Sequence, residues 1–89
     1  EGMILSNEPG YYKKGKFGIR IENLLYVKKI KNNLFFENLT LAPIDHDLID
    51  FKKLNSYEKD YLLKYNILVY SKISPYLNKK EKKWLASFI

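Results

Sequence analysis

The hydrophobic pattern of this chain changes its period once, near Asn55. Before that residue, apolar and polar side chains alternate in short segments typical of strands, and the clearest is "IRIENLLYVKKI" at 19–30. After it, apolar residues recur at the spacing of an amphipathic helix. Because the two patterns are segregated along the chain, we expect an α+β fold in which antiparallel strands, mostly within 1–51, precede two helices within 52–89.

The expected sheet has three strands, at 3–7, 19–30 and 34–44. Pro9-Gly10 predicts a turn after the first strand, and "KNN" at 31–33 predicts the hairpin loop before the last. The segment "DHDLIDFKKL" that follows is expected to form a loop or a short irregular turn. The whole of 1–89 then forms at most one small domain, with the limited burial that is usual for chains of this length.

Two capping patterns predict where the helices begin. Asn55 is followed three residues later by Glu58, and Asn78 in the same way by Glu81. Pro75 is expected to end the first helix, because it disfavours helical backbone at the residue before it. The apolar face of the first helix comprises Tyr57, Tyr61, Leu62, Tyr65, Leu68, Val69 and Ile73, and that of the second Trp84, Leu85 and Phe88. At this spacing we interpret the aromatic residues as core or interface, and not as a stacking platform for bases.

Composition excludes several classes of protein. With no cysteine among the 89 residues, disulfides cannot hold the fold, and no apolar run approaches the roughly 20 residues that span a bilayer. The net charge of +6 suggests nucleic acid as a partner, but fifteen of the sixteen basic residues are lysines, most of them scattered in pairs. Arginine suits bidentate recognition of phosphates and bases better than lysine does, so nucleic acid is not the expected partner.

Two glutamates flank the hairpin-like segment "NEPGYYKKGKFGIRIE" at 7–22. In its second strand Arg20 and Glu22 should share one face, opposite an apolar face. Pairing of the two strands would bring Glu8 and Glu22 within several ångströms, where two carboxylates repel unless a cation lies between them. The residues leave two interpretations open: a site for a hard divalent metal, or solvated acids with a surface pair between Glu22 and Arg20.

The sequences "GMILSNEPGYYKKGKFGIRIENLLYV" and "FENLTLAPIDHDLID", followed by a helix with "YEKDYLLKYN", form a specific combination. Together they closely resemble the C-terminal end of the Xaa-Pro aminopeptidases (aminopeptidase P), the proline-directed branch of the pita-bread metallopeptidases. The resemblance covers nearly the whole chain and is weakest beyond residue 76. It implies a C-terminal fragment of the pita-bread fold, and a reaction that releases an N-terminal residue followed by proline.

The active site of that family is a dinuclear metal centre, usually of manganese, held by two aspartates, one histidine and two glutamates. The resemblance maps the two glutamates onto Glu8 and Glu22. It implies that Glu22 bridges both metals, and that Glu8 binds one metal and shuttles a proton. Arg20 and Tyr12 are implied to orient the ligands and the reaction intermediate. Activation of water by two metals would account for the hydrolysis.

The other three ligands lie upstream in the family, in a region that this chain does not contain. His46, the single histidine, lies between Asp45 and Asp47, and we interpret it as an exposed loop residue and not as a metal ligand. The family pattern "PID…LID" implies structural roles for Asp45 and Asp50. Since two ligands of five cannot hold a dinuclear centre with useful affinity, we expect the 89-residue chain alone to be inactive.

The leading hypothesis is the C-terminal part of a cytoplasmic Xaa-Pro aminopeptidase. Its partners would be the remainder of the catalytic domain, a peptide with proline at the second position and, as is common among relatives, a second copy in a homodimer. No membrane partner is expected. The alternative is a non-catalytic remnant that binds other proteins through exposed apolar surface. A basic nucleic-acid binder is the third hypothesis, and salt-dependent binding would favour it.

Overall fold

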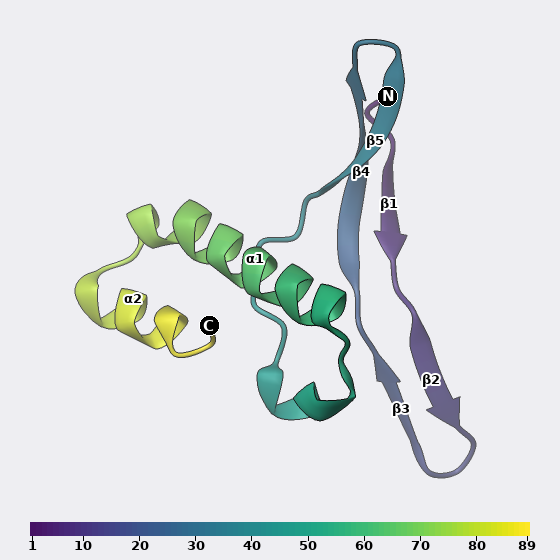
Figure 1. The fold of residues 1–89 in the computed structure, drawn as a ribbon, viewed down its shortest axis with the longest axis vertical. Coiled ribbons are helices and arrows are strands. Elements are labelled where there is room, and N and C mark those ends of the chain that lie inside the picture. Colours follow the sequence, from purple (N-terminus) through teal and green to yellow (C-terminus); the bar gives the residue numbers. More distant parts are fainter. The chain divides into compact units, whose positions relative to one another are not determined.

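The computed structural model describes all residues from 1 to 89, which form two units, Glu1–Thr40 and Leu41–Ile89. The first unit contains all the strands and the second contains all the helices (Figure 1). The expected α+β order, with antiparallel strands followed by two helices, is confirmed. None of the helices is both long and apolar enough to cross a membrane.

The first unit is built from five strands, β1 (Ile4–Asn7), β2 (Gly10–Lys13), β3 (Phe17–Arg20), β4 (Asn23–Ile30) and β5 (Asn33–Asn38). Strands β1, β4 and β5 form a three-stranded antiparallel sheet in the order β1-β4-β5, and β2 pairs with β3 as an antiparallel ribbon. The strand predicted over 19–30 is therefore divided into β3 and β4, with a break at residues 21 and 22.

The two ladders share one register. Asn7 lies opposite Asn23 at the end of one ladder, and Gly10 lies opposite Arg20 at the start of the other. Two residues separate these pairs on each strand, so no bulge intervenes. The N–H of Ile21 donates to the carbonyl of Pro9 across the gap at 3.1 Å. Proline has no N–H to return the bond, which accounts for the interruption of an otherwise continuous hairpin.

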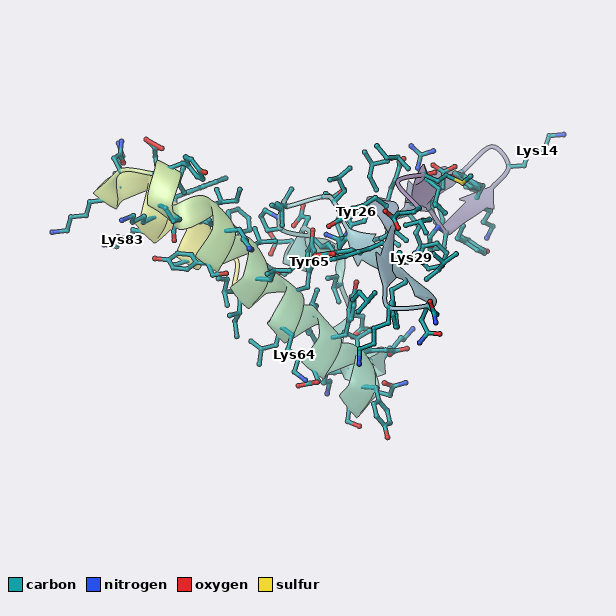
Figure 2. The ribbon with its side chains drawn as sticks, turned by 90° about the horizontal axis from the view of Figure 1, so that it is seen from above. Lys14, Tyr26, Lys29, Lys64, Tyr65 and Lys83 are labelled. Carbon is teal, nitrogen blue, oxygen red and sulfur yellow. The ribbon has the colours of Figure 1, made fainter.

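The prediction of a turn at Pro9-Gly10 is wrong, because the chain stays extended there and β2 begins at Gly10. The reversal lies at residues 14–16, where the N–H of Lys16 donates to the carbonyl of Lys13 at 3.0 Å. Gly15 has a φ of 70°, a backbone conformation that glycine adopts without steric cost. Figure 2 shows Lys14 extending from the tip of this hairpin.

The third strand is shorter than the predicted 34–44, because β5 ends at Asn38. Side chains there take over the hydrogen bonding of the ladder. The amide of Asn23 donates to Asn38 Oδ1 at 3.1 Å, and the N–H of Leu24 donates to Thr40 Oγ1 at 2.8 Å. The Asn38 amide also donates to the carbonyl of Thr40. These bonds close the open end of the β4–β5 hairpin.

The second unit begins with two short 3-10 turns, η1 (His46–Leu48) and η2 (Phe51–Lys53). Asp45 caps the first turn by accepting from the N–H of Asp47 at 3.0 Å, and Asp50 caps the second by accepting from the N–H of Lys52 at 3.2 Å. The expected irregular segment is confirmed, and both aspartates have the structural role that the sequence pattern implied.

Two helices follow, α1 (Ser56–Ile73) and α2 (Lys79–Ala86), separated by a further 3-10 turn, η3 (Ser74–Tyr76). Asn55 and Glu58 form a reciprocal capping box, with bonds of 2.8 and 2.9 Å between each side chain and the other residue's N–H. Asn78 Oδ1 accepts from the N–H of Glu81 at 2.9 Å at the start of α2. Both predicted helix starts are confirmed.

The core of the second unit is small. Tyr65, Val69 and Leu85 are buried together, and Ile44, Tyr70, Ile73 and Leu77 pack against them. The Tyr65 hydroxyl donates to the carbonyl of Ala42 at 2.5 Å. The predicted apolar face of α1 was too wide: Tyr57 is 87% exposed and Tyr61 and Leu68 are also exposed, because a single short helix covers only part of it. Trp84 likewise points outward on α2.

The first unit has no buried side chain; every buried residue belongs to the second. Phe35 and Phe36 are neighbours on β5 and therefore lie on opposite faces of the sheet, yet both are exposed. Leu24 on β4 and Leu34 on β5 are exposed as well. A sheet with apolar residues exposed on both faces normally packs against other elements on both sides.

Candidate functional site

Glu8 and Glu22 lie in the two gaps of the interrupted hairpin, Glu8 between β1 and β2, and Glu22 between β3 and β4. The shared register places them opposite each other. The neighbouring pair, Pro9 and Ile21, is joined by a backbone hydrogen bond. The Glu8–Glu22 pair therefore occupies the closer, non-hydrogen-bonded position of an antiparallel ladder, where Cα atoms are typically about 4.5 Å apart and both side chains leave the same face.

Arg20 shares this face with Glu22. Its Nη2 lies 3.0 Å from Glu22 Oε2, which confirms that the two side chains project to the same side of the strand. The two side chains are 51% and 37% exposed, so the ion pair contributes little to stability. The predicted surface pair between Glu22 and Arg20 is thus present.

Tyr12 lies on the same face, and its ring covers Gly10 and Gly18. An added Cβ at Gly18 would meet Tyr12 Cδ1 at 2.6 Å, and one at Gly10 would meet the Tyr12 hydroxyl oxygen at 2.6 Å. Both distances are far below van der Waals contact, so only glycine leaves room for the ring. Gly10 is paired with Arg20, hence the hydroxyl end of the ring points along the hairpin toward the two glutamates.

One face of the hairpin therefore gathers the four residues that the sequence singled out: Glu8, Tyr12, Arg20 and Glu22. The two glycines that accommodate the Tyr12 ring were not singled out. Their role depends on the pairing of Gly18 with Tyr12 across the ribbon, which is known only once the register is known. The sequence offers one signal of this role, the spacing of Tyr12 two residues after Gly10, which places both on one face of a strand.

The chemistry of this donor set fits part of a metal centre. Carboxylate oxygens are the ligands that hard divalent cations prefer, and a cation would remove the repulsion between two opposed carboxylates. The chain has no group of three or more histidine, cysteine, aspartate or glutamate side chains that could hold a metal ion. The Glu8–Glu22 pair could supply two ligands to such a centre.

His46 is not the exposed loop residue that the sequence suggested. Its side chain is 38% exposed, with Nε2 lying 3.4 Å from Asp47 Oδ1 and its ring in edge contact with Phe88 at 5.7 Å. Residues 45–54 are folded into capped turns, and this packing accounts for the difference. His46 belongs to the second unit and is not a member of any metal-binding group.

A second polar cluster lies on the sheet, where Glu37 of β5 is paired with Tyr26 of β4. The Lys28 ammonium lies 3.0 Å from Glu37 Oε2. Hydrogen bonding to Glu37 raises the pKa of Tyr26, with a smaller contribution from partial burial, and raises the pKa of Lys28 as well. These contacts link the two strands of a hairpin and are explained by sheet pairing alone.

Comparison with known families gives two matches that together cover almost the whole chain. Residues 1–29 match metallopeptidase family M24, and residues 32–87 match the family described as the C-terminal region of peptidase M24. The first match contains Glu8, Tyr12, Arg20 and Glu22, and the second contains β5 and both helices.

Curated relatives agree with these matches. A probable Xaa-Pro aminopeptidase P from Laccaria bicolor is 48% identical over 84 residues, which are 85% of this chain and 13% of that protein. Aminopeptidase P2 from Arabidopsis thaliana is 44% identical over 93 residues, covering 94% of this chain and 13% of that protein. The chain thus spans about one eighth of the length of these relatives.

Among solved structures, an X-prolyl aminopeptidase from Caenorhabditis elegans matches with a TM-score of 0.80 and 34% sequence identity. The match covers 96% of this chain and 15% of that one. That protein is described as a cytosolic enzyme with a di-nuclear active site. The agreement in fold extends over both units of the chain.

Proposed function

Since the chain belongs to the M24 metallopeptidase family, we propose that it forms the C-terminal part of an Xaa-Pro aminopeptidase with a dinuclear metal centre. The observation that carries this proposal is the opposition of Glu8 and Glu22 on the face that also holds Arg20 and Tyr12. The names of the relatives and of the solved structure support the reaction, which would release an N-terminal residue that precedes proline.

In this proposal Glu22 would hold both metal ions and Glu8 would hold one of them. Two divalent ions, when bound, would activate a water molecule and stabilise negative charge on the peptide carbonyl oxygen. Glu8 would accept a proton from the attacking water and return it to the departing amine. We take manganese as the metal, by resemblance to the family.

Arg20 and Tyr12 would act on the same site from the hairpin. The Arg20 guanidinium lies 3.0 Å from Glu22 Oε2 and would help to orient that carboxylate within the full catalytic domain. The Tyr12 hydroxyl points toward the end of the hairpin where Glu8 and Glu22 lie. It could donate a hydrogen bond to a metal ligand or to the carbonyl oxygen of the substrate. Both would be positioning residues for Glu22 or for the substrate.

The rest of the catalytic domain is a required partner in this proposal. The chain spans 13–15% of its relatives, and its sheet has exposed apolar residues on both faces. Two ligands alone bind a divalent ion weakly, so the isolated 89 residues would be inactive. A cytoplasmic location and a homodimer are part of the same proposal, the former supported by the description of the C. elegans enzyme.

The test is hydrolysis of a peptide with proline at the second position, with an otherwise identical peptide carrying alanine there as the control. The polypeptide in its full native length, supplied with manganese, should cleave the first peptide in preference to the second. The isolated 89-residue chain should cleave neither. Hydrolysis by the isolated chain, or no proline preference in the native polypeptide, would contradict the proposal.

The alternative proposal, a non-catalytic module that binds proteins, is favoured by one observation, the exposure of apolar residues on both faces of the sheet. The mass of the native polypeptide separates the two. A species several times heavier than 10.6 kDa supports the peptidase, whereas a native species of 10.6 kDa that lacks any complementing chain supports the module.

A further inference from the structure

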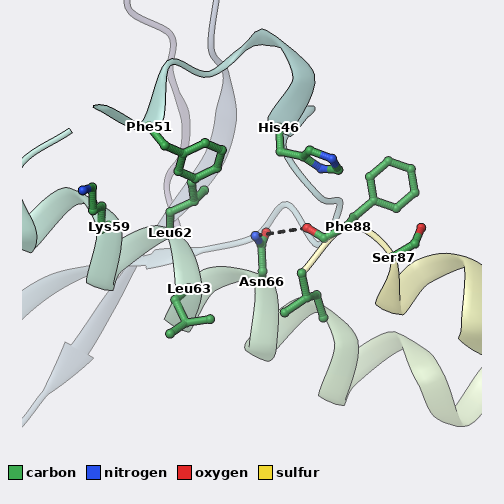
Figure 3. Close-up of a pocket in the computed structure, with 9 residues that line it drawn as sticks. His46, Phe51, Lys59, Leu62, Leu63, Asn66, Ser87 and Phe88 are labelled. Atoms are coloured by element: carbon green, nitrogen blue, oxygen red, sulfur yellow. Dashed lines mark hydrogen bonds between the residues drawn. The ribbon is translucent and has the colours of Figure 1, made fainter. Parts of the chain in front are cut away.

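The second unit contains a pocket of about 220 Å³ beside α1, with Phe51 and Phe88 in its lining (Figure 3). Two side-chain atoms of its lining residues have no hydrogen-bond partner, Asn66 Oδ1 and His46 Nδ1, but both are shielded from solvent. Neither atom can therefore bind a ligand in the pocket. More specific polar contacts lie in the first unit, next to Glu22.

Glu22 belongs to neither ladder of the first unit, so the bonds of its neighbours fix its place. Before it, the N–H of Ile21 donates to the carbonyl of Pro9 at 3.1 Å. After it, Asn23 is paired with Asn7 of β1. Both contacts hold the same edge of the strand, because alternate residues of a strand direct their N–H and carbonyl groups to opposite edges.

The opposite edge is held at Leu24, two residues after Glu22. The N–H of Leu24 donates to Thr40 Oγ1 at 2.8 Å. The carbonyl of Leu24 accepts from the N–H of Leu39 at 2.8 Å and from that of Thr40 at 3.4 Å. Thr40 thus binds both backbone groups of Leu24, and its side chain takes the place of a strand residue at the point where the β4–β5 ladder has ended.

Asn38 supports this arrangement. Its amide nitrogen donates to the carbonyl of Thr40, and its Oδ1 accepts from the amide of Asn23 at 3.1 Å. Asn23, Asn38 and Thr40 are half-buried, although the neighbouring Leu24 and Leu39 are exposed. The covered side chains at this end of the hairpin are therefore the polar ones, in the reverse of the usual order.

We propose that Thr40 is a positioning residue for Glu22, which it serves by fixing the backbone two residues away. The inference rests on the proposed dinuclear centre, in which Glu22 would hold both ions. Loss of a group that orients a metal ligand typically lowers metal affinity 10–100-fold. The bond to Thr40 Oγ1 is exposed, so water can replace it at little cost to stability, but water does not hold the backbone in place.

A purely structural role for Thr40, as the closing contact of the hairpin, is the alternative. It predicts that metal affinity falls only in step with stability, whichever contact of the hairpin is removed. The proposed role predicts a loss of metal affinity that exceeds the loss of stability, and only when the hydroxyl beside Leu24 is removed.

The experiment measures the manganese affinity of the native-length polypeptide by EPR titration, which detects the free ion, and the stability of the metal-free protein by urea denaturation. Thr40→Val keeps the shape of the side chain and removes the acceptor, so it should raise the dissociation constant by roughly tenfold or more. Thr40→Ser keeps the hydroxyl and should bind manganese as the unchanged protein does. Lys28→Met removes the 3.0 Å contact with Glu37 on the same hairpin and should also leave the affinity unchanged.

Asn38→Ala removes the two side-chain bonds that support Thr40, should also weaken manganese binding, and decides the matter if Thr40→Val fails to fold. Unchanged affinity in these variants, or an equal loss in Thr40→Ser or Lys28→Met, would overturn the proposal alone. Glu22→Gln identifies failure of the centre itself. If the unchanged protein binds no manganese, or Glu22→Gln binds it equally well, the proposed centre is wrong and the role of Thr40 is overturned with it.

Discussion

The ring of Tyr12 lies so close to Gly18 that a Cβ at that glycine would be 2.6 Å from Tyr12 Cδ1. The two residues are paired across the β2–β3 ribbon, on the face that holds Arg20 and Glu22. A glycine in the middle of a strand is usually unfavourable, since it adds backbone entropy to the unfolded state and packs no side chain. Here its missing side chain fixes where the tyrosine hydroxyl can lie.

Gly18→Ala should displace the Tyr12 ring and reduce kcat of the native-length enzyme by about tenfold or more, since small misplacements of catalytic groups have large effects on rate. Because the ring is exposed and can rotate away, the free energy of unfolding should change by less than about 1 kcal/mol. The measurement is kcat and KM for a peptide with proline at the second position.

A double-mutant cycle provides the control for this prediction. In a Tyr12→Ala background, Gly18→Ala should have little further effect on kcat, because the ring it displaces is gone. Additive effects of the two changes would show that Gly18 acts through the strand and not through Tyr12.

The capping box at the start of α1 predicts unequal effects for two asparagines. Asn55→Ala removes the bond from the N–H of Glu58 to Asn55 Oδ1 and loosens the turn in which Glu58 accepts from the backbone N–H of residue 55. Asn78→Ala removes one bond, to the N–H of Glu81, that has no reciprocal partner. We expect Asn55→Ala to lower the free energy of unfolding by about 1–2 kcal/mol, and Asn78→Ala by about 0.5–1 kcal/mol. Urea denaturation measures both, with the exposed Lys80→Ala as the control; a reversed order would contradict the structure.

Two neighbours on α2 should differ sharply, although the sequence places both on its apolar face. Leu85 is 4% exposed and packs with Tyr65 and Val69, whereas Trp84 is 61% exposed. Leu85→Ala should cost about 2–5 kcal/mol, because it leaves a cavity in a small core. Trp84→Ala, although it removes more atoms, should cost less than about 1 kcal/mol. Equal losses in thermal or urea denaturation would place Trp84 in the core and contradict the structure.

Glu37 predicts a pH dependence of the β4–β5 hairpin. Hydrogen bonding to Glu37 raises the pKa of Tyr26 above 10.0 and that of Lys28 above 10.5, so both protonated groups are stabilised in the folded state. Their contribution to stability is complete below the unfolded pKa values, and is lost as pH rises through the raised ones. Glu37→Gln should move the titration of both groups back toward 10.0 and 10.5.

NMR titration of the Tyr26 ring and the Lys28 side chain measures this shift, with Tyr57 as an exposed reference tyrosine. Unchanged titration of Tyr26 and Lys28 in the Glu37→Gln variant would remove Glu37 as the cause.

The comparison of sequence and structure shows where pattern reasoning succeeds. Capping depends on residues three apart, so Asn55 and Asn78 could be located from the sequence alone. The shared face of Arg20 and Glu22 follows from the alternation of side chains along a strand, and their 3.0 Å contact confirms it. Both features are local, and neither depends on what the chain packs against.

The wrong predictions have a common cause: each depends on which other residues a segment packs against, and local sequence does not specify that. The composition of Pro9-Gly10 predicts a turn, but the backbone of proline is equally compatible with an extended strand, and Gly10 makes room for Tyr12. Tyr57 fits the helical stripe of α1 and is nevertheless 87% exposed, since periodicity does not say how much of a face will be covered. Asn66 is buried by tertiary packing, and a polar residue gives no signal of burial in the sequence.

The most direct test of the central claim is the metal content of the native-length polypeptide, measured by mass spectrometry after dialysis against trace manganese. The unchanged protein should retain two divalent ions per chain, Glu22→Gln should lose both, and Glu8→Gln should lose at least one. Glu37→Gln, which alters another exposed glutamate of the first unit, should retain both. Full retention of metal by both Glu8→Gln and Glu22→Gln would contradict the account and leave the two carboxylates as ordinary surface acids.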